Sequence, residues 1–164
     1  GTNQVRPSLM AGVLVSQKTL SGQKNKWPGR YPPTEFLAAC EYRRGEKWYN
    51  AFEKCWLVHY HTDDVAGLPL QVDQLAKLCH RFVDGFQFNL CWPEPTIIAK
   101  IRNKYPCIRL VLQVGEKALD DIDWLGTNLS RKIEPYGGLI DAVLLDPSGG
   151  AGQTFDPPPN SPIG

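Results

Sequence analysis

The fold is decided by residues 55–90, which read CWLVHYHTDDVAGLPLQVDQLAKLCHRFVDGFQFNL. Two runs in this stretch, residues 55–61 and 85–90, are short, apolar and rich in β-branched and aromatic side chains, which is typical of strands buried on both faces. Between them, residues 68–82 repeat apolar side chains at steps of three and four, which predicts an amphipathic helix. A strand, a helix and a strand in this order indicate two parallel strands joined by a right-handed crossover.

The same alternation continues on both sides of this unit. Further strands are predicted at residues 10–16, 108–114 and 139–146, and further helices at residues 34–43, 94–105 and 117–136. A break near Gly126 or Asn128 is expected to divide the last helix. The pattern predicts an α/β protein with a parallel sheet of about five strands, in a single domain. An open doubly wound sheet and part of an eight-stranded barrel both satisfy this order, and length alone favours the open sheet, because a whole barrel needs roughly 200 residues or more.

Composition restricts the class of partner. The chain has 164 residues, and its 18 Lys and Arg balance 17 Asp and Glu without a basic block, so we expect neither a nucleic-acid nor a membrane partner. No apolar run approaches the ~20 residues that span a bilayer.

The cysteines bear on the cellular location. The five cysteines are odd in number and never spaced C-x-x-C, which indicates reduced thiols, and no secretory signal is recognisable. These features predict a cytoplasmic protein.

Polar side chains gather at the carboxyl ends of the predicted strands, where parallel α/β folds bind ligands. His59 and His61 share one face of their strand, since side chains alternate. Such a pair, with an aspartate just beyond it, could hold a metal ion, although packed or hydrogen-bonded histidines are the commoner outcome. Gln87 and Asn89 also share a face, and two amides in an apolar strand need partners, which a ligand or the protein itself could supply.

The most specific local signal is residues 140–156, which read IDAVLLDPSGGAGQTFD. Asp146 ends an apolar strand, and a glycine-rich loop follows whose backbone N–H groups can approach an anion. In the alternative interpretation, Asp146 merely caps or turns the chain. The long loop of residues 17–33 carries Arg30 among other cations and aromatic side chains. These could clamp a planar anion or belong to a solvated surface loop.

Residues 140–156 closely resemble the sixth strand and loop of phosphoribosylanthranilate isomerase, where V-D-x-L-L-L-D-S precedes G-T-G-K-T-F-D-W. Residues 83–89, VDGFQFN, are similar to the family's fourth-strand D-G-V-Q-L-H-G, and residues 30–33, RYPP, resemble its second-strand loop S-P-R-Y-I-S-P. Residues 56–64 take the place of its third strand. The resemblance spans roughly residues 12–156 and implies parallel β/α units forming part of a TIM (β/α)8 barrel, strands two to six, in place of the open sheet.

This resemblance also implies a reaction, an Amadori rearrangement of N-(5-phosphoribosyl)anthranilate in tryptophan biosynthesis that needs no cofactor. A general acid protonates the furanose ring oxygen, the ring opens to a Schiff base, and a general base removes the C2′ proton. Asp146 matches the family's acid, and Arg30 matches the residue that meets the anthranilate carboxylate. The substrate-binding residues expected on this basis are Arg30, Gln87, Asn89, Gly149 and Gly150.

Several parts of the family pattern are missing. The family's base is a cysteine in a K-I-C-G sequence that this chain lacks, and the phosphate-binding loops after strands seven and eight have no counterpart. The chain therefore looks like an incomplete or divergent member, which these losses could leave inactive. Two alternatives stay open: a metal-dependent hydrolase using His59 and His61, and a non-catalytic phosphosugar-binding module. We expect a phosphorylated sugar as partner, and the open edges of an incomplete barrel favour a homodimer.

Overall fold

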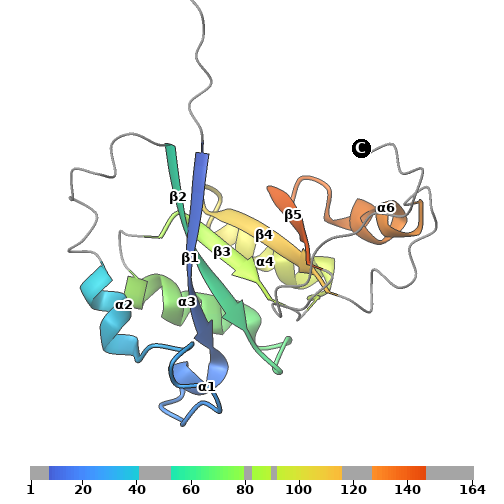
Figure 1. Ribbon diagram of the computed structural model, residues 1–164. Coiled ribbons are helices and arrows are strands. Elements are labelled where there is room, and N and C mark those ends of the chain that lie inside the picture. The colour runs from blue at the N-terminus through green and yellow to red at the C-terminus, as the bar shows by residue number, and fades with distance from the viewer. Residues whose placement is uncertain (1–7, 41–52, 80–82, 90–91, 116–126, 147–164) are drawn as a thin grey trace, which may run out of the picture.

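A five-stranded, all-parallel sheet with helices packed against it makes the chain an α/β protein. The computed structural model describes residues 8–40, 53–79, 83–89, 92–115 and 127–146. The strands are β1 (Ser8–Ser16), β2 (Glu53–His61), β3 (Gly85–Phe88), β4 (Arg109–Val114) and β5 (Ala142–Leu145). They lie in the sheet in the same order as in the chain (Figure 1). The expected parallel sheet is thus confirmed, and its order has no switch point of the kind that defines a doubly wound sheet.

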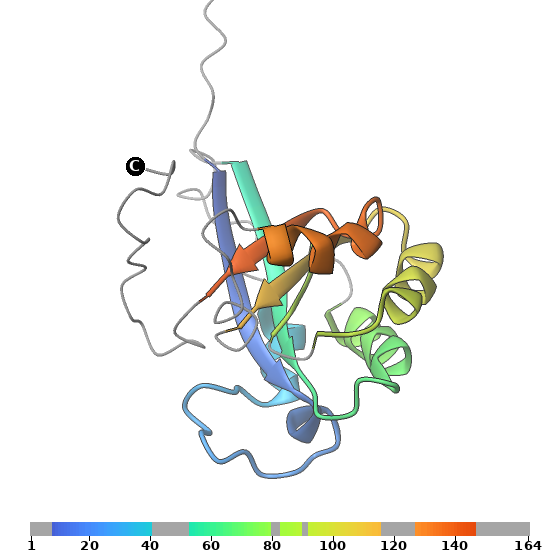
Figure 2. The same cartoon turned by 90° about the vertical axis from the view of Figure 1, so that its right-hand side faces the viewer.

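The helices cover one face of this sheet. They are α1 (Gln17–Leu20), α2 (Thr34–Cys40), α3 (Leu68–Cys79), α4 (Pro95–Lys104), α6 (Thr127–Ile133) and the 3-10 helix η3 (Glu134–Tyr136). α3 contacts both α2 and α4, and α4 contacts η3. Figure 2 shows α3 and α4 side by side on the same side of the strands. Right-handed crossovers between strands added in sequence produce this one-sided cover. None of the helices in the described ranges is long and apolar enough to cross a membrane.

Alternation along the strands separates a helix-facing core from the opposite face. Val58 and Tyr60 of β2 are fully buried, and they join apolar side chains of the neighbouring strands and helices in one cluster. That cluster includes Phe86, Phe88, Leu110, Leu112, Leu68, Val72, Leu75, Ile98 and Ile101. Each fully buried side chain of this size stabilises the fold by about 1.5–3 kcal/mol. On the opposite face, Cys55, Leu57 and Val111 form a separate small cluster.

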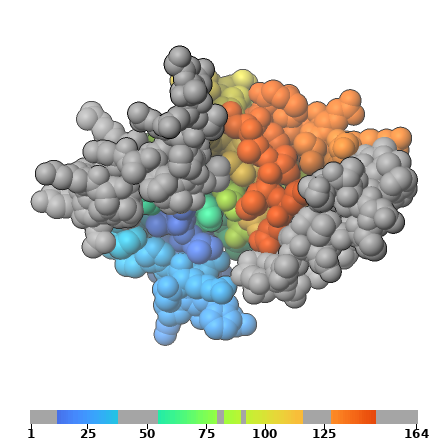
Figure 3. Space-filling model, turned by 45° about the horizontal axis from the view of Figure 1, so that its top comes forward, coloured from blue at the N-terminus to red at the C-terminus, as the bar shows by residue number. Residues whose placement is uncertain are grey.

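The sheet is not closed, because β1 and β5 each pair with a single strand among the described residues. β5 is short and open to solvent, with Leu144 and Leu145 exposed by 40% and 42%. Figure 3 shows the β5 atoms, at the red end of the colour range, on the surface of the molecule. Within the described ranges the outer edge of β5 has no partner strand, and an edge of this kind can pair with another strand.

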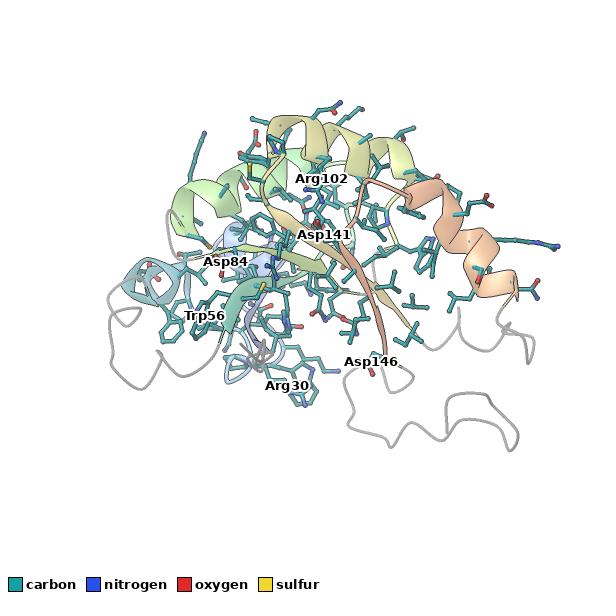
Figure 4. All side chains as sticks on the ribbon, turned by 90° about the horizontal axis from the view of Figure 1, so that it is seen from above. Arg30, Trp56, Asp84, Arg102, Asp141 and Asp146 are labelled. Carbon is teal, nitrogen blue, oxygen red and sulfur yellow. The ribbon has the colours of Figure 1, made fainter. Side chains whose placement is uncertain are left out.

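Two aspartates fix the register of the strands at their amino ends. Asp84, just before β3, accepts a hydrogen bond from the backbone N–H of Trp56 at 2.8 Å, and Asp141, just before β5, accepts one from Leu110 at 2.7 Å. Arg102 of α4 donates to the Asp141 carboxylate at 2.6 Å and to three backbone carbonyls (Figure 4). Burial alone would raise the pKa of Asp141, but the bonds from Leu110 and Arg102 outweigh it and lower this pKa below its usual value.

The predicted loop of residues 17–33 contains a helix that the sequence did not indicate. α1 is one turn long, and Ser16 caps its start by accepting a hydrogen bond from the backbone N–H of Thr19 at 3.3 Å. Four residues are too few to show helical periodicity, so a pattern-based reading places them in a loop.

The other differences lie at the ends of elements. β3 ends at Phe88, two residues before its predicted end, although the backbone N–H of Asn89 still bonds to Tyr60 at 2.8 Å. β5 begins at Ala142, three residues after its predicted start, because a turn at Gly138, where φ is +75°, occupies that place. Parts of three predicted helices, residues 41–43, 80–82 and 117–126, lie outside the described residues.

Candidate functional site

A hollow of about 540 Å³ lies over the sheet face that the helices leave uncovered. All five strands contribute to it, together with the loop that follows α1. Its lining residues are Leu14, Trp27, Arg30, Tyr31, His59, His61, Gln87, Asn89, Gln113, Leu144 and Asp146. Apart from the three loop residues, all of these stand near the carboxyl ends of the strands, which is where parallel α/β folds carry their ligand sites.

Strand register explains why residues distant in sequence meet in this hollow. Leu14, His59 and Gln87 are direct neighbours across β1, β2 and β3, and Gln113 lies beside Leu144 across β4 and β5. Their side chains share a face, because the alternate residues of the same strands point into the helix-facing core. The hollow is therefore a direct product of the parallel pairing.

Two buried glutamines link the middle of the sheet to Asp146. Gln87 donates through Nε2 to Oε1 of Gln113 at 2.7 Å, and Gln113 donates through Nε2 to Oδ2 of Asp146 at 2.7 Å. Both glutamines are 4% exposed. The protein itself thus supplies a partner for Gln87, and Gln113 orients the carboxylate. The predicted strand of residues 108–114 includes Gln113, but the sequence did not identify Gln113 as a site residue. Its role depends on a hydrogen bond to Asp146, which follows the next strand along the chain.

Asn89 lines the hollow and carries an unsatisfied acceptor. Its side-chain Oδ1 is buried and has no hydrogen-bond partner within the described parts of the chain. Its backbone groups are engaged, since the N–H donates to Tyr60 and the carbonyl lies 3.2 Å from Nδ1 of His61. Buried polar atoms without partners are uncommon in folded proteins. Oδ1 of Asn89 is therefore a place where a hydroxyl or N–H group of a ligand could donate a hydrogen bond.

The imidazole of His59 is partly buried and lies over β1. Burial lowers its pKa, because desolvation disfavours the charged ring. The ring lies over Gly12, where an added Cβ would stand 2.1 Å from Nε2 of His59. Glycine at this position thus makes room for the ring.

His61 is held differently. A carbonyl oxygen can only accept, so the contact with Asn89 requires the proton on Nδ1. The other ring nitrogen, Nε2, lies 3.7 Å from Oδ1 of Asp63. In the described ranges no group of three or more His, Cys, Asp or Glu residues could hold a metal ion. The metal-dependent hydrolase built on His59 and His61 accordingly finds no ligand set in these parts of the chain.

Four of the six residues expected from the sequence line this one hollow: Arg30, Gln87, Asn89 and Asp146. Arg30 comes from an exposed loop, whereas Asp146 is half-buried and its backbone N–H donates to Val114 at 3.1 Å. Figure 4 shows Arg30 and Asp146 on the side of the sheet opposite α3 and α4. The other two, Gly149 and Gly150, lie outside the described residues.

Comparison with protein-family models, with curated protein sequences and with solved structures finds no match to this chain. The resemblance to phosphoribosylanthranilate isomerase therefore stays an expectation based on the quoted residues.

Proposed function

We propose that this protein is an isomerase-like acid–base catalyst of the phosphoribosylanthranilate isomerase type, built on consecutive units of a (β/α)8 barrel. The observation that carries the proposal is the meeting of Asp146, Arg30, Gln87 and Asn89 in one hollow. Strands in sequential order, with helices on one face, are also what neighbouring barrel units have in common.

Asp146 is assigned the role of general acid. It ends β5 beside the hollow, and the bond from Gln113 holds its carboxyl group in one orientation. From there it would deliver a proton to the furanose ring oxygen, so that the bond between this oxygen and C1′ breaks and a Schiff base forms. Arg30 would pair with the anthranilate carboxylate, and Oδ1 of Asn89 would accept a hydrogen bond from a sugar hydroxyl.

His59 is assigned the role of general base. Its imidazole lines the same hollow as Asp146. Because burial lowers the pKa of His59, the ring is unprotonated at neutral pH and can accept the C2′ proton. Loss of this proton from the Schiff base gives an enol-amine, which tautomerises to the ketose.

The proposal is tested with freshly made phosphoribosylanthranilate, whose anthranilate fluorescence reports the rearrangement. We expect turnover by the 164-residue chain and a loss of roughly 100-fold or more in Asp146→Asn and in His59→Gln, the range for loss of a general acid or base. Glu35→Gln, which alters an exposed carboxylate of α2 outside the hollow, is the matched control and should keep full activity.

Circular dichroism of each variant shows whether it is folded, so that a loss of activity is not mistaken for unfolding. Turnover no faster than in buffer, or an Asp146→Asn variant as active as the unmodified chain, would reject the proposal. Saturable binding of the substrate without turnover would favour the phosphosugar-binding module instead.

A further inference from the structure

A second hollow, of about 420 Å³, lies at the carboxyl ends of β1 and β2. It is continuous with the first in its walls, because Trp27, Tyr31 and His61 line both. The two hollows are therefore adjacent, with His61 between the strand-end residues of one and the loop residues of the other.

The wall of the second hollow is held by bonds within the chain. The Ser16 hydroxyl donates to Oδ1 of Asn25 at 2.7 Å, and Nδ2 of Asn25 donates to the Thr19 hydroxyl at 2.7 Å. Ser16 and Thr19 are 5% and 8% exposed. This ring of hydrogen bonds ties the loop back to the end of β1, so the hollow is formed before any ligand arrives.

Two ammonium groups give this hollow its charge. Lys18 and Lys26 line it, and within the described ranges neither has a carboxylate within 4.0 Å. The Lys26 ammonium lies 5.4 Å from the centre of the Trp27 ring, which favours its position at the wall. Asp63 supplies one negative charge to the lining, but its side chain is 87% exposed and adjoins His61. Two cations in one concave site attract a dianion more strongly than a singly charged group.

We propose that the second hollow binds the phosphate monoester group of a ligand whose sugar lies in the first hollow. This inference rests on the proposed function for the sugar, whereas the binding of phosphate follows from Lys18 and Lys26 alone. Lysine binds a phosphate group as a point charge, and here Lys18 of α1 and Lys26 of the loop that follows α1 line the same hollow.

The first experiment titrates the full chain with inorganic phosphate and follows backbone amide shifts by NMR. We expect saturable shifts at residues 16–19, with a dissociation constant of about 1 mM that rises with added sodium chloride. The double variant Lys18→Gln/Lys26→Gln should weaken binding about 25-fold, corresponding to roughly fivefold for each exposed charge. Lys24→Gln is the matched control, because Lys24 belongs to the same loop, is exposed, and does not line the hollow. Its affinity should be unchanged.

The second experiment compares ribose 5-phosphate with ribose. Ribose 5-phosphate should shift amides at both hollows, including Gln113, and should bind at least tenfold more tightly than ribose. The absence of saturable shifts with phosphate, or equal weakening by Lys24→Gln and by the double variant, would overturn the inference.

The same measurements distinguish failure of the isomerase proposal from failure of the phosphate-site proposal. Asp146→Asn should bind phosphate as the unmodified chain does. Lysine-dependent phosphate binding without isomerisation would reject the isomerase and keep this inference. Isomerisation with a KM that the double variant leaves unchanged would reject this inference and keep the isomerase.

Discussion

Replacing Gln87 and Gln113 separately and together measures the energy that couples these two side chains, and Gln113 in turn orients Asp146. Gln113→Leu leaves Nε2 of Gln87 buried without an acceptor, and an unsatisfied buried group destabilises a protein by about 1–3 kcal/mol. It also removes the donor to Asp146, but that carboxylate is half-buried and regains water, so we assign this loss about 1 kcal/mol. Gln87→Leu leaves Oε1 of Gln113 unsatisfied in the same way. In the double variant both partners are apolar, and neither amide is left without a partner.

Both penalties for an unsatisfied buried atom are absent from the double variant, so it should be about 2–6 kcal/mol more stable than the sum of the two single effects predicts. Urea unfolding at pH 7, followed by circular dichroism, gives the four free energies of unfolding, provided that the urea dependence is the same in all four proteins. Single effects that add to within about 0.5 kcal/mol would refute this reasoning, because independent sites behave in that way.

Four further changes test other features. Burial lowers the pKa of His59, so below about pH 6.5 the unfolded chain binds more protons than the folded chain. The free energy of unfolding should therefore decrease as the pH falls below about 6.5. In His59→Gln the urea midpoint should depend less on pH over this range. Gly12→Ala should displace the imidazole, and NMR titration should show its pKa moving back toward 6.5. The fold lowers the pKa of Asp141, so its carboxylate stabilises the protein at pH 7, and this contribution is lost as the pH falls below about 4 and the group is protonated. Asp141→Asn should therefore reduce the free energy of unfolding by about 1 kcal/mol at pH 7 and by less below about pH 4, as measured by urea unfolding. If the open edge of β5 pairs with a second copy, light scattering should show a dimer that Leu145→Lys makes monomeric; a monomeric unmodified chain would contradict this.

Periodicity and composition were sufficient to predict the fold class and the core of each strand. The predicted run 55–61 falls inside β2, and the predicted run 108–114 differs from β4 only by residue 108, because burial on both faces leaves a clear local signal. Strand order was harder to predict. Length favoured an open doubly wound sheet, and local patterns carry no information on which edge of the sheet each new strand joins.

The candidate site was predictable where a residue stands at a strand end, and less so where its role depends on a distant partner. Asp146 and Gln87 could be selected from their position after or within an apolar run. The bond that joins them through Gln113 requires the register of β3, β4 and β5 together. The space that Gly12 leaves for His59 likewise arises from the approach of two strands whose residues are far apart in the chain.

The hydrogen bonds that Asp84 and Asp141 accept from neighbouring strands affect how the sheet can be altered. Each aspartate accepts a hydrogen bond from the strand that precedes its own, so the β2–β3 pair and the β4–β5 pair each hold their own alignment. Lengthening a connection or exchanging a whole unit therefore leaves the alignment of the other pairs in place. A chain with this property can gain or lose units by duplication and deletion, and can be recombined in the laboratory at the same boundaries.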